Sequence, residues 1–370
     1  MKINKVLYLL RDRLENLPPS MSQILTLCQS GLSVTVVTTY ASQYIRDFYK
    51  TANVEFVTLE KRYAPGNSVF DKARNLLNYI KLVNKEVMKN SFDLLWIGSA
   101  DTARYCKKSV ITPKPSVLNI YELYDRQPQV IKAITPVAQN TDYVIVPEYN
   151  RAHILKVWLG LTKTPTVIPN KPCFPEVEIL PETKRIVDEI TALNKKVILY
   201  QGWIGKDRDV TKIAEALGIL ENKDDFALVL LGSVVSDDMI ENIKGIFKNT
   251  IHIPFLQPPQ HLFVTETAHI GIATYDDSSL NNIFCAPNKI YEYAEKNVPV
   301  LARDIPGLSG TIGKFGAGVC VDMDNADAIA KAIQKICDNY TAYTSSLQAF
   351  LNEYSVENTI NEIIRSFEGK

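Results

Sequence analysis

The feature that most constrains the fold is an alternation of short apolar runs with longer amphipathic stretches. The short runs predict strands at residues 5–10, 33–39, 54–59, 92–98, 116–121 and 141–147. Helical patterns lie between them, and the longest, 71–89, has one apolar face that carries Leu76, Leu77, Ile80 and Val83. Because strands that alternate with helices pair in parallel through right-handed crossovers, the pattern predicts an α/β fold.

The alternation is interrupted once and then resumes. Residues 171–195 are rich in Pro and Glu and end in a polar helix, and we interpret them as a linker. Further strands are predicted at 196–201, 226–231, 251–255, 269–274, 298–302 and 318–321, and final helices at 326–337 and 356–367. The 370 residues exceed what one hydrophobic core usually serves. We therefore predict two Rossmann-like, doubly wound parallel-sheet domains, 1–170 and 196–350, facing each other across a cleft, followed by the segment 351–370.

Composition excludes several classes of protein. The chain is 46% hydrophobic and 22% charged, with 41 basic and 41 acidic residues, which is typical of a folded protein and not of a nucleic-acid binder. Residues 1–170 hold 22 basic against 13 acidic residues, and the remainder 19 against 28. The basic half favours contact with an anionic membrane surface or a phosphate-bearing substrate; solvated helix faces are the alternative. Six cysteines without a CxxC pair indicate a cytoplasmic protein, and no run approaches a membrane span.

The loop after the predicted strand 196–201 suits a diphosphate. Gly202 and Gly205 let backbone N–H groups approach a phosphate, and the next helix, near residue 210, adds a favourable dipole. Lys206 and Arg208 supply positive charge in the same loop. An ordinary tight turn with surface charges is the alternative interpretation.

A second loop, 286–300, suits a ribose. Pro287 or Asn288 can begin a helix whose free N–H groups face the cleft. Glu292, one turn inside that helix, can accept hydrogen bonds from two hydroxyls of a ribose, although a glutamate there is often only dipole compensation. The four histidines lack metal-ligand spacing, so we expect structural or surface roles for them: His153, His252, His261 and His269.

These segments together resemble the retaining glycosyltransferases of family 4 (group 1), which have the GT-B fold. Residues 287–294, Pro-Asn-Lys-Ile-Tyr-Glu-Tyr-Ala, followed by Val298-Pro299-Val300, are similar to the donor-binding signature of that family. Similar segments occur in the expected order at 144–147, 167–170, 200–202, 230–232, 253–255 and 354–358. The resemblance implies an acceptor-binding N-terminal domain, a nucleotide-sugar-binding C-terminal domain, and a last helix that crosses back to the first domain.

The resemblance also implies roles for single residues. Arg208 and Lys206 would neutralise the donor diphosphate, and Glu292 would hold the ribose. The full donor side would be Gly202, Gly232, Pro254, Phe255, Asn282, Pro287, Asn288, Lys289 and Glu292. Two positions depart from the family. Trp203 stands where many relatives have an arginine, and Phe284 stands in place of the first of two glutamates, for which Asp276, Asp277, Asn281 or Asn282 could substitute.

The N-terminal domain would supply the acceptor side. Tyr121 stands where the family often has a histidine, so Glu122 and Asp125 are the candidate carboxylates for orienting donor or acceptor hydroxyls, unless they are ordinary loop charges. Arg208, Lys206 and Glu122 are then the candidate catalytic residues. The first loop lacks the family's usual glycine pair and offers three acceptor-side candidates instead: Arg11, Arg13 and Ser20.

The expected function is transfer of a sugar from a nucleotide-diphosphate sugar to a glycan or a polyprenyl-diphosphate-linked glycan, with retention. The expected setting is the synthesis of bacterial capsule, lipopolysaccharide or exopolysaccharide at the cytoplasmic face of the membrane, with no metal and no cofactor. Two rivals remain open. One is a sugar-nucleotide epimerase on the same scaffold, and the other is a non-catalytic sugar-nucleotide-binding partner, which the glutamate missing at Phe284 favours.

Overall fold

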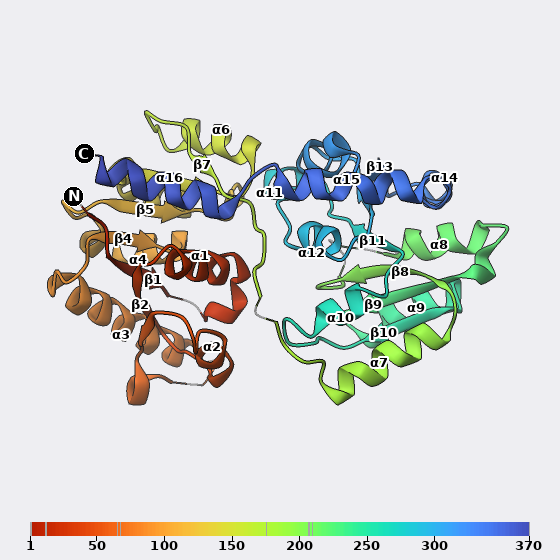
Figure 1. Ribbon diagram of the computed structural model, residues 1–370, viewed down its shortest axis with the longest axis horizontal. Helices are drawn as coiled ribbons and strands as arrows, with labels where there is room; N and C mark the ends of the chain where they lie inside the picture. Colours follow the sequence, from red (N-terminus) through yellow and green to blue (C-terminus); the bar gives the residue numbers. More distant parts are fainter. Residues whose placement is uncertain are drawn as a thin grey trace. The chain divides into compact units, whose positions relative to one another are not determined.

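The computed structural model describes residues 2–11, 13–64, 66, 68–174, 176–205, 208 and 210–369. The chain divides into two compact units, which we call unit 1 (Met1–Cys173 with Tyr354–Lys370) and unit 2 (Phe174–Glu353) (Figure 1). Each unit is built on one parallel sheet with helices connecting its strands. The predicted fold class, two Rossmann-like α/β domains, is confirmed.

Unit 1 has a seven-stranded sheet in the order β3-β2-β1-β4-β5-β6-β7, and every pair is parallel. Its strands are β1 (Lys5–Leu10), β2 (Ser33–Thr38), β3 (Val54–Val57), β4 (Leu94–Ile97), β5 (Ser116–Asn119), β6 (Tyr143–Val146) and β7 (Thr166–Val167). Its helices are η1 (Leu14–Asn16), α1 (Pro18–Gln29), α2 (Gln43–Phe48), η2 (Glu60–Arg62), α3 (Val69–Met88), α4 (Ala100–Val110), α5 (Pro128–Gln139), α6 (Tyr149–Trp158) and α16 (Val356–Glu368).

Unit 2 has a six-stranded parallel sheet in the order β10-β9-β8-β11-β12-β13. Its strands are β8 (Lys196–Gln201), β9 (Phe226–Leu231), β10 (Thr250–Ile253), β11 (Ile270–Ala273), β12 (Val300–Arg303) and β13 (Gly318–Val321). Its helices are α7 (Pro181–Ala192), α8 (Thr211–Ile219), η4 (Lys223–Asp225), α9 (Asp237–Ile246), α10 (His261–Thr265), α11 (Leu280–Ile283), α12 (Lys289–Glu295), α13 (Pro306–Leu308), η5 (Ser309–Gly313), α14 (Ala326–Asp338) and α15 (Tyr340–Asn352).

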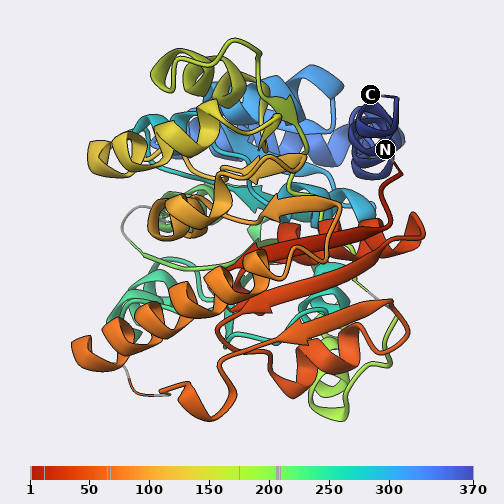
Figure 2. The same cartoon turned by 90° about the vertical axis from the view of Figure 1, so that its left-hand side faces the viewer.

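The twelve predicted strands are all present, and the structure adds β7, whose two residues are too short for a periodic pattern to reveal. The apolar face predicted for 71–89 needs a correction. In α3 the buried residues are Tyr79, Leu82, Val83 and Glu86, whereas Leu77 is 60% exposed. Figure 2 shows α3 in orange, lying against β2 of its unit. Among the described residues, no helix combines the length and apolar character needed to cross a bilayer.

The stretch interpreted as a linker, 171–195, is divided between the units. The residues up to Cys173 belong to unit 1. Helix α7 (Pro181–Ala192) lies in unit 2, where it packs against α10. The last helix, α16, belongs to unit 1. Ile360, Ile363, Ile364 and Phe367 of α16 are buried, α16 contacts α1, and Tyr143 of β6 packs edge-on against Phe367.

Close packing against β11 fixes the position of α12 within unit 2. A Cβ atom at Gly271 of β11 would lie 2.5 Å from the ring of Tyr293, so only glycine lets this ring rest on the strand. The Tyr293 hydroxyl accepts a hydrogen bond from the backbone N–H of Gln201 at 3.2 Å. The carbonyl oxygens of Leu199 and Ile272 also lie 3.2 Å from this hydroxyl. The tyrosine thereby fixes α12, which carries Glu292, against the ends of β8 and β11.

Candidate functional site

The strand order of unit 2 indicates where a ligand would bind. From β8 the chain continues through β9 and β10 on one side, whereas β11, β12 and β13 follow on the other. The loops after β8 and β11 therefore leave neighbouring strands in opposite directions, and ligands of such sheets bind beyond the carboxyl ends of the strands at this point. The residues that follow β8, β9 and β11 form what we call the unit 2 site.

Two glycines form the floor of the unit 2 site. Gly202 follows β8 and Gly232 follows β9, with φ angles of +123° and +142°. The N–H of Gly202 donates to the carbonyl oxygen of Leu231 at 2.8 Å. A Cβ atom at Gly232 would lie 2.0 Å from the carbonyl oxygen of Gly202, so the two loops pack as closely as backbone allows. This close approach leaves the strand ends open to a ligand that needs backbone contact.

Glu292 is buried on α12 and held by two side chains from other elements. Nε2 of Gln201, the last residue of β8, donates a hydrogen bond to Oε2 of Glu292. Nε2 of His261, at the start of α10, lies 3.4 Å from Oε1 of Glu292. Thr265 in turn donates from Oγ1 to Oε1 of Gln201 at 2.8 Å, which sets the orientation of the Gln201 amide. The carboxylate is fixed in one place and keeps lone pairs for further donors.

Arg208 of the predicted cation pair lies beside the same aromatic ring as the side chain of Lys289. The guanidinium carbon of Arg208 is 4.9 Å from the centre of the Tyr275 ring. Nζ of Lys289 is 5.7 Å from the same centre and 4.2 Å from the centre of the Tyr200 ring, within range of cation–π attraction. Lys206, predicted as the partner of Arg208, lies outside the described residues.

The environment of Lys289 disfavours its charged form. The side chain is 8% exposed, and Nζ has no hydrogen-bond partner among the residues that the structure describes. Burial, and then the charge of Arg208, lower the pKa of Lys289 to about 7, although Glu292 and Cys285 act in the opposite direction. A lysine of this kind changes its charge readily when an anion arrives.

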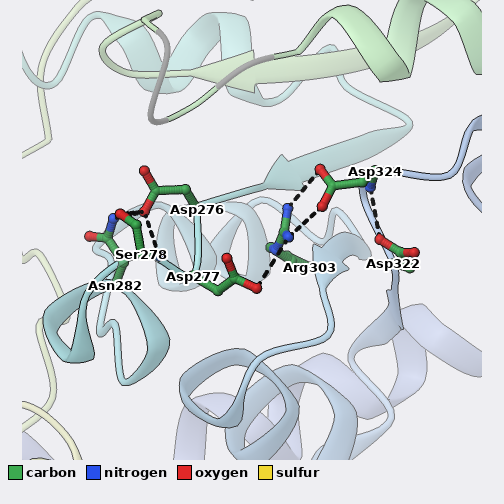
Figure 3. Close-up of polar contacts among 7 residues, drawn as sticks. All are labelled: Asp276, Asp277, Ser278, Asn282, Arg303, Asp322 and Asp324. Carbon is green, nitrogen blue, oxygen red and sulfur yellow. Dashed lines mark hydrogen bonds and ion pairs between the residues drawn. The ribbon is translucent and has the colours of Figure 1, made fainter.

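The loop that follows β11 was expected to replace the missing first glutamate, and its polar residues already interact with one another (Figure 3). Oδ1 of Asp276 accepts hydrogen bonds from Nδ2 of Asn282 and Oγ of Ser278, both at 2.7 Å. The structure thus brings Asp276 and Asn282 together. Ser279 caps the short helix α11, which contains Asn282, and the half-buried Phe284 directly follows that helix.

Asp277 of the same loop points elsewhere, toward Arg303 at the end of β12 (Figure 3). Arg303 makes a bidentate pair with Asp324, at 2.6 and 3.1 Å, and lies 3.6 Å from Asp277. The hydrogen bond to Asp324 raises the pKa of Arg303 and lowers that of Asp324. Because Asp277 is attracted to this cation, it is a weaker candidate than Asp276 for holding a sugar hydroxyl.

The remaining predicted donor residues border the same strand ends. Pro254 and Phe255 follow β10 and are exposed, and the carbonyl oxygen of Ile253 accepts from the N–H of Gly232 at 2.9 Å. Asn288 caps α12, and its carbonyl oxygen accepts from the N–H of Glu292 at 3.2 Å. Pro287, half-buried, precedes Asn288 in the same loop.

In unit 1 the acceptor-side candidates separate into two places. Arg11, directly after β1, pairs with Asp101 at the start of α4, where β1 and β4 are neighbours. Arg13 extends away toward aromatic rings, with its guanidinium donating to the hydroxyl of Tyr63 at 3.1 Å. Ser20 is fully buried, and its Oγ lies 2.8 Å from the hydroxyl of Tyr121.

Tyr121 belongs to a buried polar cluster that we call the tyrosine cluster: Tyr8, Ser20, Gln23, Trp96, Asn119 and Tyr121. Nδ2 of Asn119 donates to Oε1 of Gln23 at 2.6 Å and lies 3.2 Å from the Tyr121 hydroxyl. Burial raises the pKa of Tyr121 to about 12, so its hydroxyl stays protonated. The predicted residue Ser20 is therefore part of a structural network beneath the loop edge.

Glu122 is half-exposed and has a buried arginine beside it. Nη1 of Arg151 donates to the carbonyl oxygen of Tyr121 and lies 3.3 Å from Oε2 of Glu122. Arg151 itself is 3% exposed, and its own backbone N–H is capped by Glu148. Asp125, half-buried, lies three residues further along the same loop. The arginine holds the Glu122 carboxylate at the carboxyl end of β5.

Sequence reasoning missed four residues that orient these side chains: Gln201, His261, Thr265 and Arg151. Gln201 and Arg151 each end or follow a predicted strand, where their positions were visible but their partners were not. His261 comes from a helix that is distant in sequence from Glu292. Among the described residues no group of three or more histidines, cysteines, aspartates or glutamates could hold a metal ion.

Comparisons with known proteins show what the sequence and the fold are similar to. Residues 182–353 match the family model of glycosyl transferases group 1. Over 99% of both chains the protein is similar to HepE from Anabaena in complex with UDP and glucose (13% identity, TM-score 0.71). The same coverage is found with sucrose-phosphate synthase from Thermosynechococcus elongatus (14% identity, TM-score 0.71).

A third similar structure is a protein of Listeria monocytogenes assigned as a UDP-N-acetylglucosamine 2-epimerase, with 15% identity over 100% of this chain and 98% of that one and a TM-score of 0.67. At such identities the three structures show a shared fold. No curated protein sequence matches the chain.

Proposed function

Since residues 182–353 match the model of group 1 glycosyl transferases and each unit is built on a parallel sheet, we propose that the chain is a glycosyltransferase that moves a sugar from a nucleotide-diphosphate sugar to a glycan or lipid-linked glycan acceptor, with retention. Supporting this are the polar residues at the ends of β8, β9 and β11. A buried carboxylate, two glycines in contact, and two cations beside one tyrosine ring match the hydroxyl and phosphate groups of such a donor.

The single observation that carries the proposal is the fixed position of Glu292. A carboxylate this deeply buried is costly unless hydrogen bonds compensate it, and Gln201 and His261 supply only part of that compensation. The vicinal hydroxyls of a ribose would supply two more donors. Arg208, with Lys206 of the same loop, would then neutralise the diphosphate that leaves as the bond to the sugar breaks.

The nucleotide is proposed to be UDP or a relative of it. HepE, which shares the fold over the whole chain, was solved with UDP and glucose, and this supports a nucleotide sugar in the unit 2 site. We propose further that no metal takes part, because Arg208 and Lys289, which lie beside the Tyr275 ring, can supply the positive charge that neutralises the phosphates. Glu122, held by Arg151 in unit 1, is the carboxylate proposed to orient the reacting hydroxyls.

Calorimetric titration with UDP, GDP and their glucose and N-acetylglucosamine conjugates tests the donor site. We expect one nucleotide series to bind, and Glu292→Ala to weaken that binding by about tenfold or more because two hydrogen bonds to a charged group are lost. The matched control is Glu295→Ala, an exposed residue on the same helix, which should bind like the natural protein. Equal nucleotide binding by both variants would show that Glu292 does not hold the nucleotide.

Two rival functions are distinguished by product analysis. The likeness to a protein assigned as an epimerase favours the first rival, in which the donor alone, without acceptor, would give a new epimer. The second rival is a non-catalytic partner, which is favoured by the presence of Phe284 in place of a glutamate. Such a protein would bind the nucleotide sugar tightly and would not transfer the sugar to any acceptor. Transfer to a polyprenyl-diphosphate-linked glycan, with no epimer formed from donor alone, is the outcome expected here.

The acceptor is proposed to lie in a membrane, at the cytoplasmic face, as in the synthesis of capsule, lipopolysaccharide or exopolysaccharide. One face of α3 in unit 1 supports peripheral contact with an anionic bilayer. Phe70, Leu77 and Met88 are 87%, 60% and 83% exposed. At helical spacing they share their face with three exposed cations, Arg74, Lys81 and Lys85. We call this surface the α3 face.

A further inference from the structure

Lys289 is a buried lysine of the unit 2 site whose surroundings do not compensate its charge. Its ammonium nitrogen is enclosed by the Tyr200 ring at 4.2 Å and the Tyr275 ring at 5.7 Å, and the side chain is 8% exposed. No described residue accepts a hydrogen bond from Nζ. A Cβ atom on Gly202 would lie 3.2 Å from Nζ, so the nitrogen reaches the glycine that begins the loop after β8. The side chain is thus aimed at the floor of the site.

The groups around Lys289 do not neutralise it in this state. Glu292, one turn further along α12, attracts the ammonium, but its two oxygens face Gln201 and His261. Cys285, in the loop before α12, is a free, buried cysteine. Arg208 repels the ammonium, and Tyr200 and Tyr275 present ring faces to it. A buried ammonium with donors unused and a second cation nearby is costly, and an anion with several oxygens would relieve that cost.

We propose that the side-chain ammonium of Lys289 binds the donor diphosphate together with Arg208, and that this binding takes up protons, because the enclosed nitrogen has no hydrogen-bond partner among the described residues until an anion is bound. The inference rests on the proposed function and deepens it, since it names the residue that makes donor binding depend on pH. It also provides a cation near a loop in which Trp203 contributes none.

The direction of the pH dependence follows from the surroundings. Burial and Arg208 hold the pKa of Lys289 near 7 in the empty site. A bound diphosphate favours the charged form and raises that pKa. Between the two values each binding event takes up protons, so affinity falls as pH rises above about 7, by at most about tenfold per pH unit. Below about pH 7 Lys289 is charged in both states and contributes no pH dependence.

Proton uptake can be measured directly by titrating UDP, and separately GDP, into the protein at pH 8 in buffers that differ in ionisation enthalpy. At pH 8 the terminal phosphate of either nucleotide is already ionised, so it does not contribute. We expect the natural protein to take up roughly 0.5 to 1 proton per nucleotide. Lys289→Met should take up none and bind about tenfold more weakly at pH 7. The control Lys331→Met changes an exposed lysine of α14 and should match the natural protein.

Stability distinguishes a binding role from a structural one. Because Lys289→Met removes an uncompensated buried cation and keeps most of the volume, its thermal midpoint should equal or exceed that of the natural protein. Nucleotide binding without proton uptake, together with unchanged affinity in Lys289→Met, would overturn the inference and leave the proposed function standing. If no nucleotide or nucleotide sugar binds the natural protein, the proposed function falls and this inference with it. If the variant does not fold, proton uptake by the natural protein decides alone.

Discussion

Gly232 shows how strongly one residue can determine the unit 2 site. Its φ of +142° is unfavourable for any residue with a side chain, and the nearest backbone atom to a Cβ there would be the Gly202 oxygen at 2.0 Å. The loops after β8 and β9 can therefore meet in this way only if position 232 lacks a side chain. Because these loops carry the backbone groups proposed to approach the donor, their contact connects local geometry to binding.

We predict that Gly232→Ala destabilises the protein by at least about 1–3 kcal/mol from the backbone conformation alone, and more through the steric clash. It should also weaken nucleotide binding. The measurement is urea unfolding followed by circular dichroism. Gly245→Ala is the control, since nothing lies within 4 Å of a Cβ there, and in α9 alanine should be neutral or stabilising by up to about 1 kcal/mol. A Gly232→Ala protein as stable as the control would contradict the close packing of the two loops.

At the scale of single elements, α3 combines two surfaces of opposite character. Tyr79, Leu82 and Val83 are buried in unit 1, while the apolar and basic side chains of the α3 face are exposed. Exposed phenylalanine and methionine are costly in water, and cations beside them have no described function within unit 1. A membrane surface with anionic headgroups would bury the apolar side chains and pair with the cations.

We predict that the protein floats with vesicles that contain about one third anionic lipid and remains unbound with neutral vesicles, and that salt weakens the binding. The double change Lys81→Glu with Lys85→Glu should reduce binding strongly, since each basic residue near such a surface contributes about 1 kcal/mol. Lys331→Glu with Lys335→Glu, which makes the same charge change on α14 of unit 2, is the control. Equal binding by both double variants would exclude the α3 face as the contact.

For the molecule as a whole, the last helix determines how the chain is divided. Residues 354–370 follow unit 2 in sequence but belong to unit 1. There Ile360 and Phe367 are buried, Asn361 accepts a hydrogen bond from Ser30 at 2.7 Å, and Glu368 accepts one from the N–H of Ile3 at 3.2 Å. The stability of unit 1 therefore depends on a segment that is translated only after unit 2 is complete.

We predict that Phe367→Ala lowers the unfolding free energy of unit 1 by about 3–5 kcal/mol, because it leaves a cavity against Tyr143. Nucleotide binding to the unit 2 site should persist in the same variant. Urea unfolding monitored alongside nucleotide titration separates the two effects, with Glu357→Ala, on the exposed side of α16, as the control. Loss of nucleotide binding without loss of unit 1 stability would show that the two units are not independent in this respect.

The sequence by itself determined the elements and their class. Apolar runs at 5–10, 196–201 and 226–231 matched β1, β8 and β9 in full, because a strand buried on both faces leaves an uninterrupted apolar pattern. The glycines and Glu292 could be selected from local motifs for a related reason. Close approach of a ligand to the backbone favours glycine, and recognition of two hydroxyls favours a carboxylate.

Only the tertiary structure decided which side chains meet. Gln201 and Glu292 are 91 residues apart, and His261 reaches the same carboxylate from a third element, so no local pattern contains their contact. The burial that sets the charge of Lys289 arises in the same way, from Tyr200 on β8 and Tyr275 in the loop after the neighbouring strand β11. Periodicity along a chain records which face of an element is covered, whereas the partners of a polar group depend on how elements distant in sequence pack together.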